Sequence, residues 1–426
     1  MIVHDPIYGR FRLSDSVRQL LLTPEVRRLS QIRLLNTLTP TLATLGDLRR
    51  YSHTLGVSYL AQINQQPGYK PEEKAAFAAS VVLHDIGTPP FGHLFEYHLR
   101  EATGWNHEDV IHSVLWGFHA PENRAHQIFG GRTLGVQNVV KRTRLSLDLI
   151  QAIITRKHPL SSLLFGSLDL DNLDNVVRMA WALGLDVSAS LAPDLARALS
   201  ASRDGALMLS QSRFRGAVEQ WALLRRKVYE ILVFDVQTVA SQAALSEAIE
   251  IALKAQFLSE NDWSLYDELL IEKLRSHEKT KRLISRDYLG EPPRLIYALQ
   301  LRGGLSDHRF ANRGEAKILV DELLTSQFGK GKTLSYAFVD RGSFEKQLDF
   351  KDPDQGGWQV GVTSKSLILY AFSRVGQVPL AQATDAVKAL KGKIGTLEEV
   401  VIKCVLPTGR EEDEIGDEPQ LTLPAF

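Results

Sequence analysis

Residues 81–93, VVLHDIGTPPFGH, decide how the middle of this chain folds. An apolar helical run ends here, because a glycine and two prolines interrupt it. The adjacent pair His84-Asp85 therefore lies at a helix end, beside a turn and a further histidine, His93. A buried imidazole and carboxylate need polar partners, and coordination of a metal would satisfy both.

Helical periodicity continues on both sides of this segment. Pro71, Glu72 and Glu73 place a proline and two acids in the first turn of the helix that reaches His84. Other helices are expected at 14–22, 24–35, 48–66, 106–119, 145–155, 171–184 and, broken or continuous, 213–258, after a hairpin at 2–13. The sequence therefore predicts a mainly α fold.

The character of the chain changes near residue 290, where β-branched and aromatic runs alternate with Gly, Pro and Asp. We expect a helical domain at 1–260, a smaller C-terminal α+β accessory region at 261–410 and an acidic tail at 411–426. The strand candidates are short and few, so the accessory region is expected to form an oligomer interface.

Composition excludes several classes of protein. Lys+Arg and Asp+Glu each number 50 among 426 residues, so no net charge favours nucleic acid or an acidic membrane. Cys404 is the only cysteine, which excludes an intrachain disulfide and a thiolate metal cluster. The first residues show no apolar leader, and no apolar stretch could span a bilayer. We expect a cytoplasmic protein.

Two imidazoles and two carboxylates stand out as metal-ligand candidates, because hard or borderline divalent metals take this set when they also hold a water. They are His53, His84, Asp85 and Asp171. The neighbouring Asp169 and Asp174 are interpreted as capping and dipole-complementing residues of the helix that begins near residue 171.

Four ordered motifs carry a family resemblance: RYSHTLG (50–56), VVLHDIGTPPFGHLFE (81–96), NHED (106–109) and DLDNLDNVVRMAWALGL (169–185). Together they resemble the HD-domain superfamily of metal-dependent phosphohydrolases. Within it, the chain is most similar to the deoxynucleotide triphosphohydrolases, namely the bacterial dGTPases and the animal sterile-alpha-motif/HD enzyme. The similarity covers residues 3–185 and implies that the helical domain is an HD-domain bundle.

The resemblance assigns roles residue by residue. His53, His84, Asp85 and Asp171 match the ligands of one divalent metal, which would be Fe, Mn, Ni, Co or Zn; additional Mg would arrive with the nucleotide. His93 and Glu96 match a histidine and an acid beside the scissile phosphate, and His107 matches a further active-site histidine.

Three residues are implied or considered as contacts to substrate phosphate. Arg50 matches a phosphate-binding arginine, Thr88 stands where family members usually carry His, and Arg178 is a further basic candidate. Other positions depart from the animal enzyme: Asn172 and Asn175 replace a Lys and a Tyr, and Leu34 replaces the glutamine that reads the sugar.

The resemblance implies metal-dependent hydrolysis of a phosphoester or phosphoanhydride in a nucleotide, with a (deoxy)nucleoside triphosphate as the first candidate. An HD phosphatase or phosphodiesterase acting on a monophosphate or cyclic nucleotide is an alternative. A metal-containing regulatory module that binds nucleotide is another. The basic run 273–286 with Tyr288 raises single-stranded nucleic acid as a further partner, but such runs are usually solvated helix faces.

Overall fold

The computed structural model describes residues 1–36, 39–116, 135–302, 313–340, 342, 344–363, 366–394, 401–407 and 411–413. The chain divides into two compact units. The first comprises Met1–Glu291 and Gly342–Thr363, and the second comprises Pro292–Arg341 and Ser364–Phe426. This division differs from the boundary predicted at residue 260, because helices beyond that residue pack against α14 (Val236–Lys254) of the first unit.

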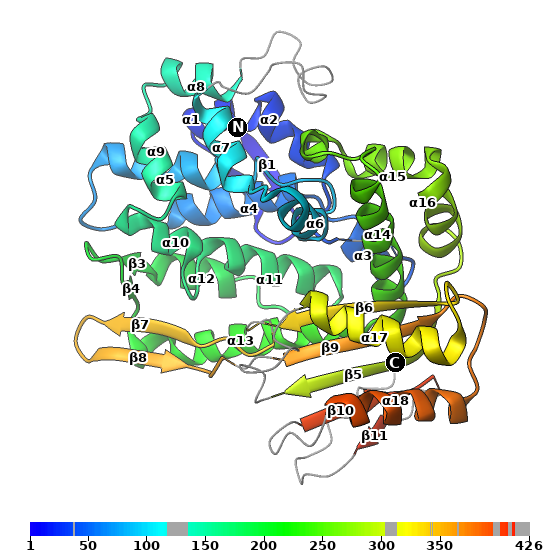
Figure 1. Cartoon of the computed structure of the whole chain (residues 1–426). Helices are drawn as coiled ribbons and strands as arrows, with labels where there is room; N and C mark the ends of the chain where they lie inside the picture. Colours follow the sequence, from blue (N-terminus) through cyan, green and yellow to red (C-terminus); the bar gives the residue numbers. More distant parts are fainter. Residues whose placement is uncertain are drawn as a thin grey trace. The chain divides into compact units, whose positions relative to one another are not determined.

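The first unit is built mainly from helices, which confirms the predicted fold class (Figure 1). Its other α-helices are α1 (Asp15–Leu21), α2 (Pro24–Arg27), α3 (Ala43–Gly46), α4 (Arg50–Ile63), α5 (Pro71–Leu83), α6 (His93–Thr103), α7 (His107–Trp116), α8 (Val136–Arg142), α9 (Leu147–Ile154), α10 (Ser162–Phe165), α11 (Leu170–Ala182), α12 (Leu191–Ala198), α13 (Gln211–Phe234), α15 (Asp267–Ser276) and α16 (Glu278–Arg282). Short 3₁₀ segments are η1 (Arg28–Gln31), η3 (Pro159–Ser161) and η4 (Glu260–Ser264), and η5 (Leu283–Tyr288) is a π-helix.

Local signals explain where several of these elements begin. The predicted hairpin is present as β1 (Ile2–Asp5) paired antiparallel with β2 (Gly9–Arg12). Ser14 accepts a hydrogen bond from the Val17 amide and caps α1. The predicted long helical stretch is two helices, α13 and α14, which are separated at Asp235.

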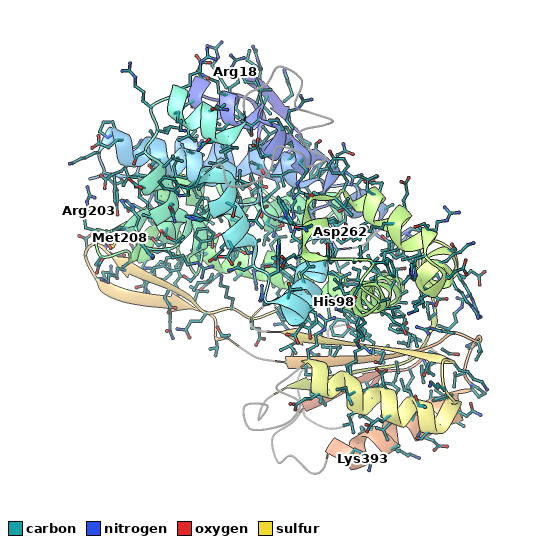
Figure 2. The ribbon with its side chains drawn as sticks, turned by 45° about the horizontal axis from the view of Figure 1, so that its top comes forward. Arg18, His98, Arg203, Met208, Asp262 and Lys393 are labelled. Atoms are coloured by element: carbon teal, nitrogen blue, oxygen red, sulfur yellow. The ribbon has the colours of Figure 1, made fainter. Side chains whose placement is uncertain are left out.

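Three helices form the part of the bundle that matters for function. α4 packs against both α5 and α11, so that the start of α4, the end of α5 and the start of α11 can meet. Side chains lie between the helices of this unit, among them His98 of α6 (Figure 2). The Nε2 of His98 lies 2.7 Å from the hydroxyl oxygen of Ser246 on α14.

The first unit also contains a four-stranded sheet in the order β3-β4-β7-β8. Its strands are β3 (Ser200–Ala201), β4 (Leu207–Met208), β7 (Leu348–Asp352) and β8 (Gly356–Val360). Trp358 on β8 donates its indole N–H to the Leu209 carbonyl at 2.9 Å, which ties the late strands to the early ones. The predicted accessory region therefore contributes residues 342–363 to the first unit.

The second unit is a small α+β structure. Its five-stranded antiparallel sheet has the order β11-β10-β5-β9-β6. The strands are β5 (Arg294–Arg302), β6 (Thr333–Asp340), β9 (Ser366–Ser373), β10 (Val401–Val405) and β11 (Glu411–Asp413), and the helices are α17 (Arg313–Phe328) and α18 (Leu380–Ile394). α17 packs on β6 and β9, and α18 packs on α17 and β5.

The strand candidates expected after residue 290 are confirmed by this sheet, in which β5, β6 and β9 are the longest strands. The first residues of the predicted acidic tail form β11, and residues 414–426 lie outside the described part of the chain. Among the described residues, no helix is long and apolar enough to cross a membrane.

Candidate metal centre and active site

Three predicted metal ligands lie together where α4, α5 and α11 meet. His53 lies in the first turn of α4, His84 follows the last residue of α5, and Asp171 lies in the first turn of α11. Their ligand atoms all lie within 4.8 Å of one another. Both histidines are buried, and 31% of the Asp171 side chain is exposed, so the group opens to solvent on the carboxylate side.

Both imidazoles turn the same ring nitrogen toward Asp171. The Nδ1 of His53 lies 2.7 Å from Asp174 Oδ2, and the Nδ1 of His84 lies 2.7 Å from the Val81 carbonyl oxygen. The Nε2 atoms of His53 and His84 lie 2.6 and 3.2 Å from Asp171 Oδ1. Such contacts to the remote nitrogen are how proteins fix the tautomer of a metal-binding histidine. The donor set therefore fits a divalent metal.

Electrostatics hold this group in its ionised form. Burial alone would lower the pKa of His53, but hydrogen bonds to Asp171 and Asp174 raise it to about 10. Burial would raise the pKa of Asp171, but the two histidines keep it well below its usual range. Binding of a divalent cation by His53 would require its imidazole to be neutral, so metal binding would release a proton.

Asp174 orients His53, a role that differs from the dipole-complementing role predicted for it. Its carboxylate is fully buried and also accepts from Arg178, with Nε to Oδ2 at 2.8 Å. Arg178 continues the chain of ion pairs to Asp5 at 3.0 Å. The sequence pattern explained an acid near the start of α11 by the helix dipole alone. The contact with His53 could not be predicted from that pattern, because the two residues are 121 positions apart in the sequence.

Arg178 does not fit the predicted contact with substrate phosphate. Its side chain is 1% exposed, and its guanidinium is engaged by Asp174 and Asp5. These carboxylates raise its pKa above the ordinary value despite burial. The prediction failed because basic character was visible in the sequence and the buried acids that neutralise it were not.

Gly56 permits the close approach of α4 to this ion-pair network. A Cβ atom at this position would lie 1.9 Å from Asp174 Oδ1 and 2.4 Å from Arg178 Nη2. No side chain larger than hydrogen fits there without displacing a buried charge.

Asp85, the predicted fourth ligand, is adjacent to the group of three. Its Oδ2 lies 3.7 Å from His84 Nε2 and accepts a hydrogen bond of 2.8 Å from Arg50 Nη1. Thr88 donates its hydroxyl to the other carboxylate oxygen at 3.1 Å. The two predicted phosphate contacts Arg50 and Thr88 therefore both hold Asp85 in this structure, and the four-ligand assignment stays a prediction.

A second cluster lies on α6 and α7. Glu96 contacts His93 Nδ1 at 3.0 Å, His107 Nδ1 at 2.6 Å and Arg100 Nη2 at 2.8 Å. The Glu96 side chain is 5% exposed, whereas the His93 side chain is 76% exposed. Burial would raise the pKa of Glu96, but hydrogen bonds from His107 and His93 lower it. Three predicted catalytic residues therefore form one hydrogen-bonded group.

The turn between α5 and α6 connects His84 of the metal-ligand group to His93 of the Glu96 cluster. Phe91 is buried and has a φ of 54°, which is unfavourable for a residue with a bulky side chain. Its amide donates to Asp267 Oδ1 at 2.8 Å, and the other oxygen of Asp267 accepts from the Arg33 amide at 2.8 Å. Backbone strain of this kind persists only where the surroundings determine it, and such positions are common at functional sites.

Asp169 has the capping role that the sequence predicted. It accepts from the Asn172 amide at 2.7 Å at the start of α11. Burial, together with the charge of Asp171, raises its pKa to about 7. Asn172, which replaces a lysine of the animal enzyme, directs its side-chain amide to Asp169 at 3.0 Å.

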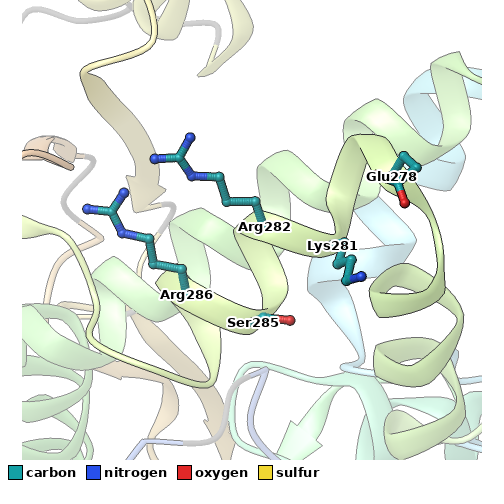
Figure 3. A pocket seen from close by; sticks show the side chains of 5 residues that line it. All are labelled: Glu278, Lys281, Arg282, Ser285 and Arg286. Carbon is teal, nitrogen blue, oxygen red and sulfur yellow. The ribbon is translucent and has the colours of Figure 1, made fainter.

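The basic run on α15, α16 and η5 forms a separate feature. Five of its residues line a cavity of about 340 Å³, namely Glu278, Lys281, Arg282, Ser285 and Arg286. Arg282 and Arg286 extend to the same side of the helix (Figure 3). None of these residues belongs to the metal-ligand group or to the Glu96 cluster.

Comparison with known proteins agrees with this site. A family model described as HD domain matches residues 50–129, which include His53, His84, Asp85 and the Glu96 cluster. This part of the chain is therefore similar to HD domains, and the match contains two of the three residues grouped as metal-ligand candidates, His53 and His84.

Relatives share only part of their length with this chain. It is 23% identical over 259 residues to the uncharacterized protein YwfO of Bacillus subtilis, and this match covers 58% of the chain and 55% of YwfO. It is 28% identical over 119 residues to human deoxynucleoside triphosphate triphosphohydrolase SAMHD1, covering 25% of the chain and 19% of that enzyme. The chain therefore spans little more than half of YwfO and about a fifth of the human enzyme.

Two solved structures have the same fold. A hypothetical protein from Aquifex aeolicus superposes with a TM-score of 0.64 at 18% identity, covering 92% of this chain and 100% of its own. A phosphohydrolase from Bacteroides thetaiotaomicron superposes with a TM-score of 0.60 at 18% identity, covering 88% and 100%. At this identity the likeness concerns the fold.

Proposed function

We propose that this protein is a metal-dependent phosphohydrolase that acts on nucleoside triphosphates, with deoxynucleotides as the preferred class. The observations that carry the proposal are the convergence of His53, His84 and Asp171 within 4.8 Å and the hydrogen-bonded cluster around Glu96. A structural metal site would need neither the exposed His93 nor its buried carboxylate partner. The pairing of the two groups therefore favours catalysis over a regulatory module.

Each group has a distinct part in the proposed reaction. A divalent metal on the three ligands would polarise a phosphoryl oxygen and activate a water. Glu96 orients His93, whose Nε2 can carry the proton that the leaving oxygen needs. His107 shares the same carboxylate and can bind phosphate or assist the proton transfer. Arg50 lies beside Asp85, where it can neutralise charge on the equatorial phosphoryl oxygens.

The choice of a deoxynucleoside triphosphate rests on similarity over a limited region. The 28% identity to SAMHD1 over 119 aligned residues supports a deoxynucleoside triphosphate as the substrate. The replacements at Asn172, Asn175 and Leu34 remove side chains that the animal enzyme directs at its nucleotide. A monophosphate or cyclic nucleotide is therefore the competing substrate class for the same metal and proton-transfer groups.

The test is a product assay on the full-length protein loaded with Mn²⁺. Deoxynucleoside and ribonucleoside triphosphates, monophosphates and cyclic nucleotides are incubated separately, and the products are resolved by anion exchange. We expect triphosphates to be consumed by the wild-type protein and not by Asp171→Asn. Exclusive turnover of monophosphates or cyclic nucleotides would replace the proposed substrate class, and no turnover by a protein that binds Mn²⁺ would refute the enzyme.

A further inference from the structure

The basic residues predicted from the motifs do not provide much free positive charge at the metal-ligand group. Arg178 is buried in its ion pairs, and Arg50 donates to Asp85. A triphosphate brings several negative charges to such a site. Another cation near Asp171 would therefore matter for binding, and the structure contains one that the motifs did not indicate.

Lys346 lies just before β7, in the segment that returns to the first unit. Its Nζ lies 3.4 Å from the carbonyl oxygen of Gly166. Ser167 accepts from the Asp349 amide at 3.1 Å and donates to the Asp349 carbonyl at 3.2 Å, so two further hydrogen bonds fix the same two segments together. Gly166 and Ser167 lead directly into Asp169, the cap of α11.

This arrangement places the ammonium group at the end of α11 that carries Asp171. The charges of Asp169 and Asp171 both act on Lys346. Burial nevertheless lowers its pKa, and the nearby Arg225 acts in the same direction. Among the described residues, no carboxylate forms an ion pair with Lys346, and the Gly166 carbonyl accepts its hydrogen bond. An anion such as a phosphate group would stabilise a half-buried ammonium that has no carboxylate in an ion pair with it.

Space for a ligand lies beside the same side chain. Lys346 lines a cavity of about 400 Å³ together with apolar side chains, which include Trp221, Phe344 and Leu348, and with the charged Arg225, Arg226 and Glu345. The indole Nε1 of Trp221 is buried and has no hydrogen-bond partner among the described residues. The cavity thus presents the Lys346 ammonium beside apolar and charged side chains, and it gives room for a ligand rich in acceptor oxygens.

We propose that Lys346 is a substrate-binding residue that contacts a phosphate group of the nucleotide at the metal-ligand group. The inference rests on the proposed function and names a residue for it that lies outside the HD motifs. A phosphate held by Lys346 would lie near Asp171, which gives polyphosphates an advantage over substrates with a single phosphate.

Two measurements on the full-length protein test this role. The first is calorimetric titration of tripolyphosphate in metal-free buffer, and the second is steady-state hydrolysis of a deoxynucleoside triphosphate with Mn²⁺. The variants are Lys346→Met and Lys346→Arg. The matched control is Lys351→Met, because Lys351 lies on the adjoining strand and makes an exposed ion pair with Asp204 at 2.7 Å.

We expect Lys346→Met to weaken tripolyphosphate binding and to raise KM by about 10–100-fold, as for the loss of a charge-assisted hydrogen bond. Lys346→Arg should restore most of this loss, and Lys351→Met should stay within about twofold of wild type on the same scale. Equal affinities for Lys346→Met and Lys351→Met would overturn the inference. If wild type hydrolyses no nucleotide but the titrations still separate these variants, the proposed enzyme fails and the phosphate contact stands.

Discussion

Gly56→Ala should reveal how tightly the metal-ligand group depends on the buried ion pairs behind it. The added methyl would lie 1.9 Å from Asp174 Oδ1, and that carboxylate is fully buried, so it has no solvent-filled space to move into. Replacing Gly by Ala inside a helix alone contributes about 1 kcal/mol of stability. Overpacking costs about 1–3 kcal/mol, and disturbing a buried ion pair adds to this cost. We expect a net destabilisation of about 2–4 kcal/mol.

A second glycine provides the control. Gly216 lies in α13, and a Cβ atom there would meet nothing within 4 Å. Gly216→Ala should therefore stabilise the protein by about 0.5–1 kcal/mol. Urea unfolding followed by tryptophan fluorescence compares both variants with wild type, and Mn²⁺ titration reports whether His53 is still held. Equal unfolding midpoints for Gly56→Ala and Gly216→Ala, with unchanged Mn²⁺ affinity, would refute the reasoning.

Three further predictions concern the active-site groups. His93→Ala should retain bound Mn²⁺ in elemental analysis and lose about 10²–10⁴-fold in kcat; wild-type turnover would remove His93 from the mechanism. Glu96→Gln should destabilise the protein by about 1–3 kcal/mol at pH 7. Because the folded pKa of Glu96 is lowered from 4.5, this difference should be complete above pH 4.5 and shrink as the pH falls below it; urea midpoints that differ equally at pH 7 and pH 3 would contradict this. Thr88→Val should weaken Mn²⁺ binding by about 10–100-fold through Asp85, and Thr88→Ser should not; equal affinities would show that the hydroxyl does not orient the carboxylate.

Much of the fold follows from local patterns, and the exceptions have tertiary causes. The helices α4, α5 and α11 begin and end near their predicted limits, because proline, glycine and capping residues act within one turn, whereas α6, which carries His93 and Glu96, was not predicted. The helix expected at 24–35 is shorter, since α2 ends at Arg27 and a 3₁₀ turn follows. Arg28 in that turn is buried and donates to the carbonyl oxygens of Thr88 and Leu265. These contacts join segments that are distant in the sequence, so no local sequence pattern predicts them.

The candidate site was predictable where ordered motifs supply its residues. The sequence correctly indicated that His53, His84 and Asp171 would lie together, and that Glu96 would lie beside His93. It did not indicate which acids and bases neutralise one another in the interior, because pairing depends on packing between elements. The orienting role of Asp174 became visible only in three dimensions.

The return of residues 342–363 to the first unit has a consequence for biosynthesis. The chain leaves this unit after Glu291, comes back at Gly342 and departs again after Thr363. The ribosome therefore makes β7, β8 and Lys346 after it has made the helices of the first unit, which these strands then join. At about 5–20 residues per second, the ribosome needs several seconds to make the intervening segment. Any nucleotide-binding competence that depends on Lys346 would thus be acquired late in synthesis, after the metal ligands have already been made.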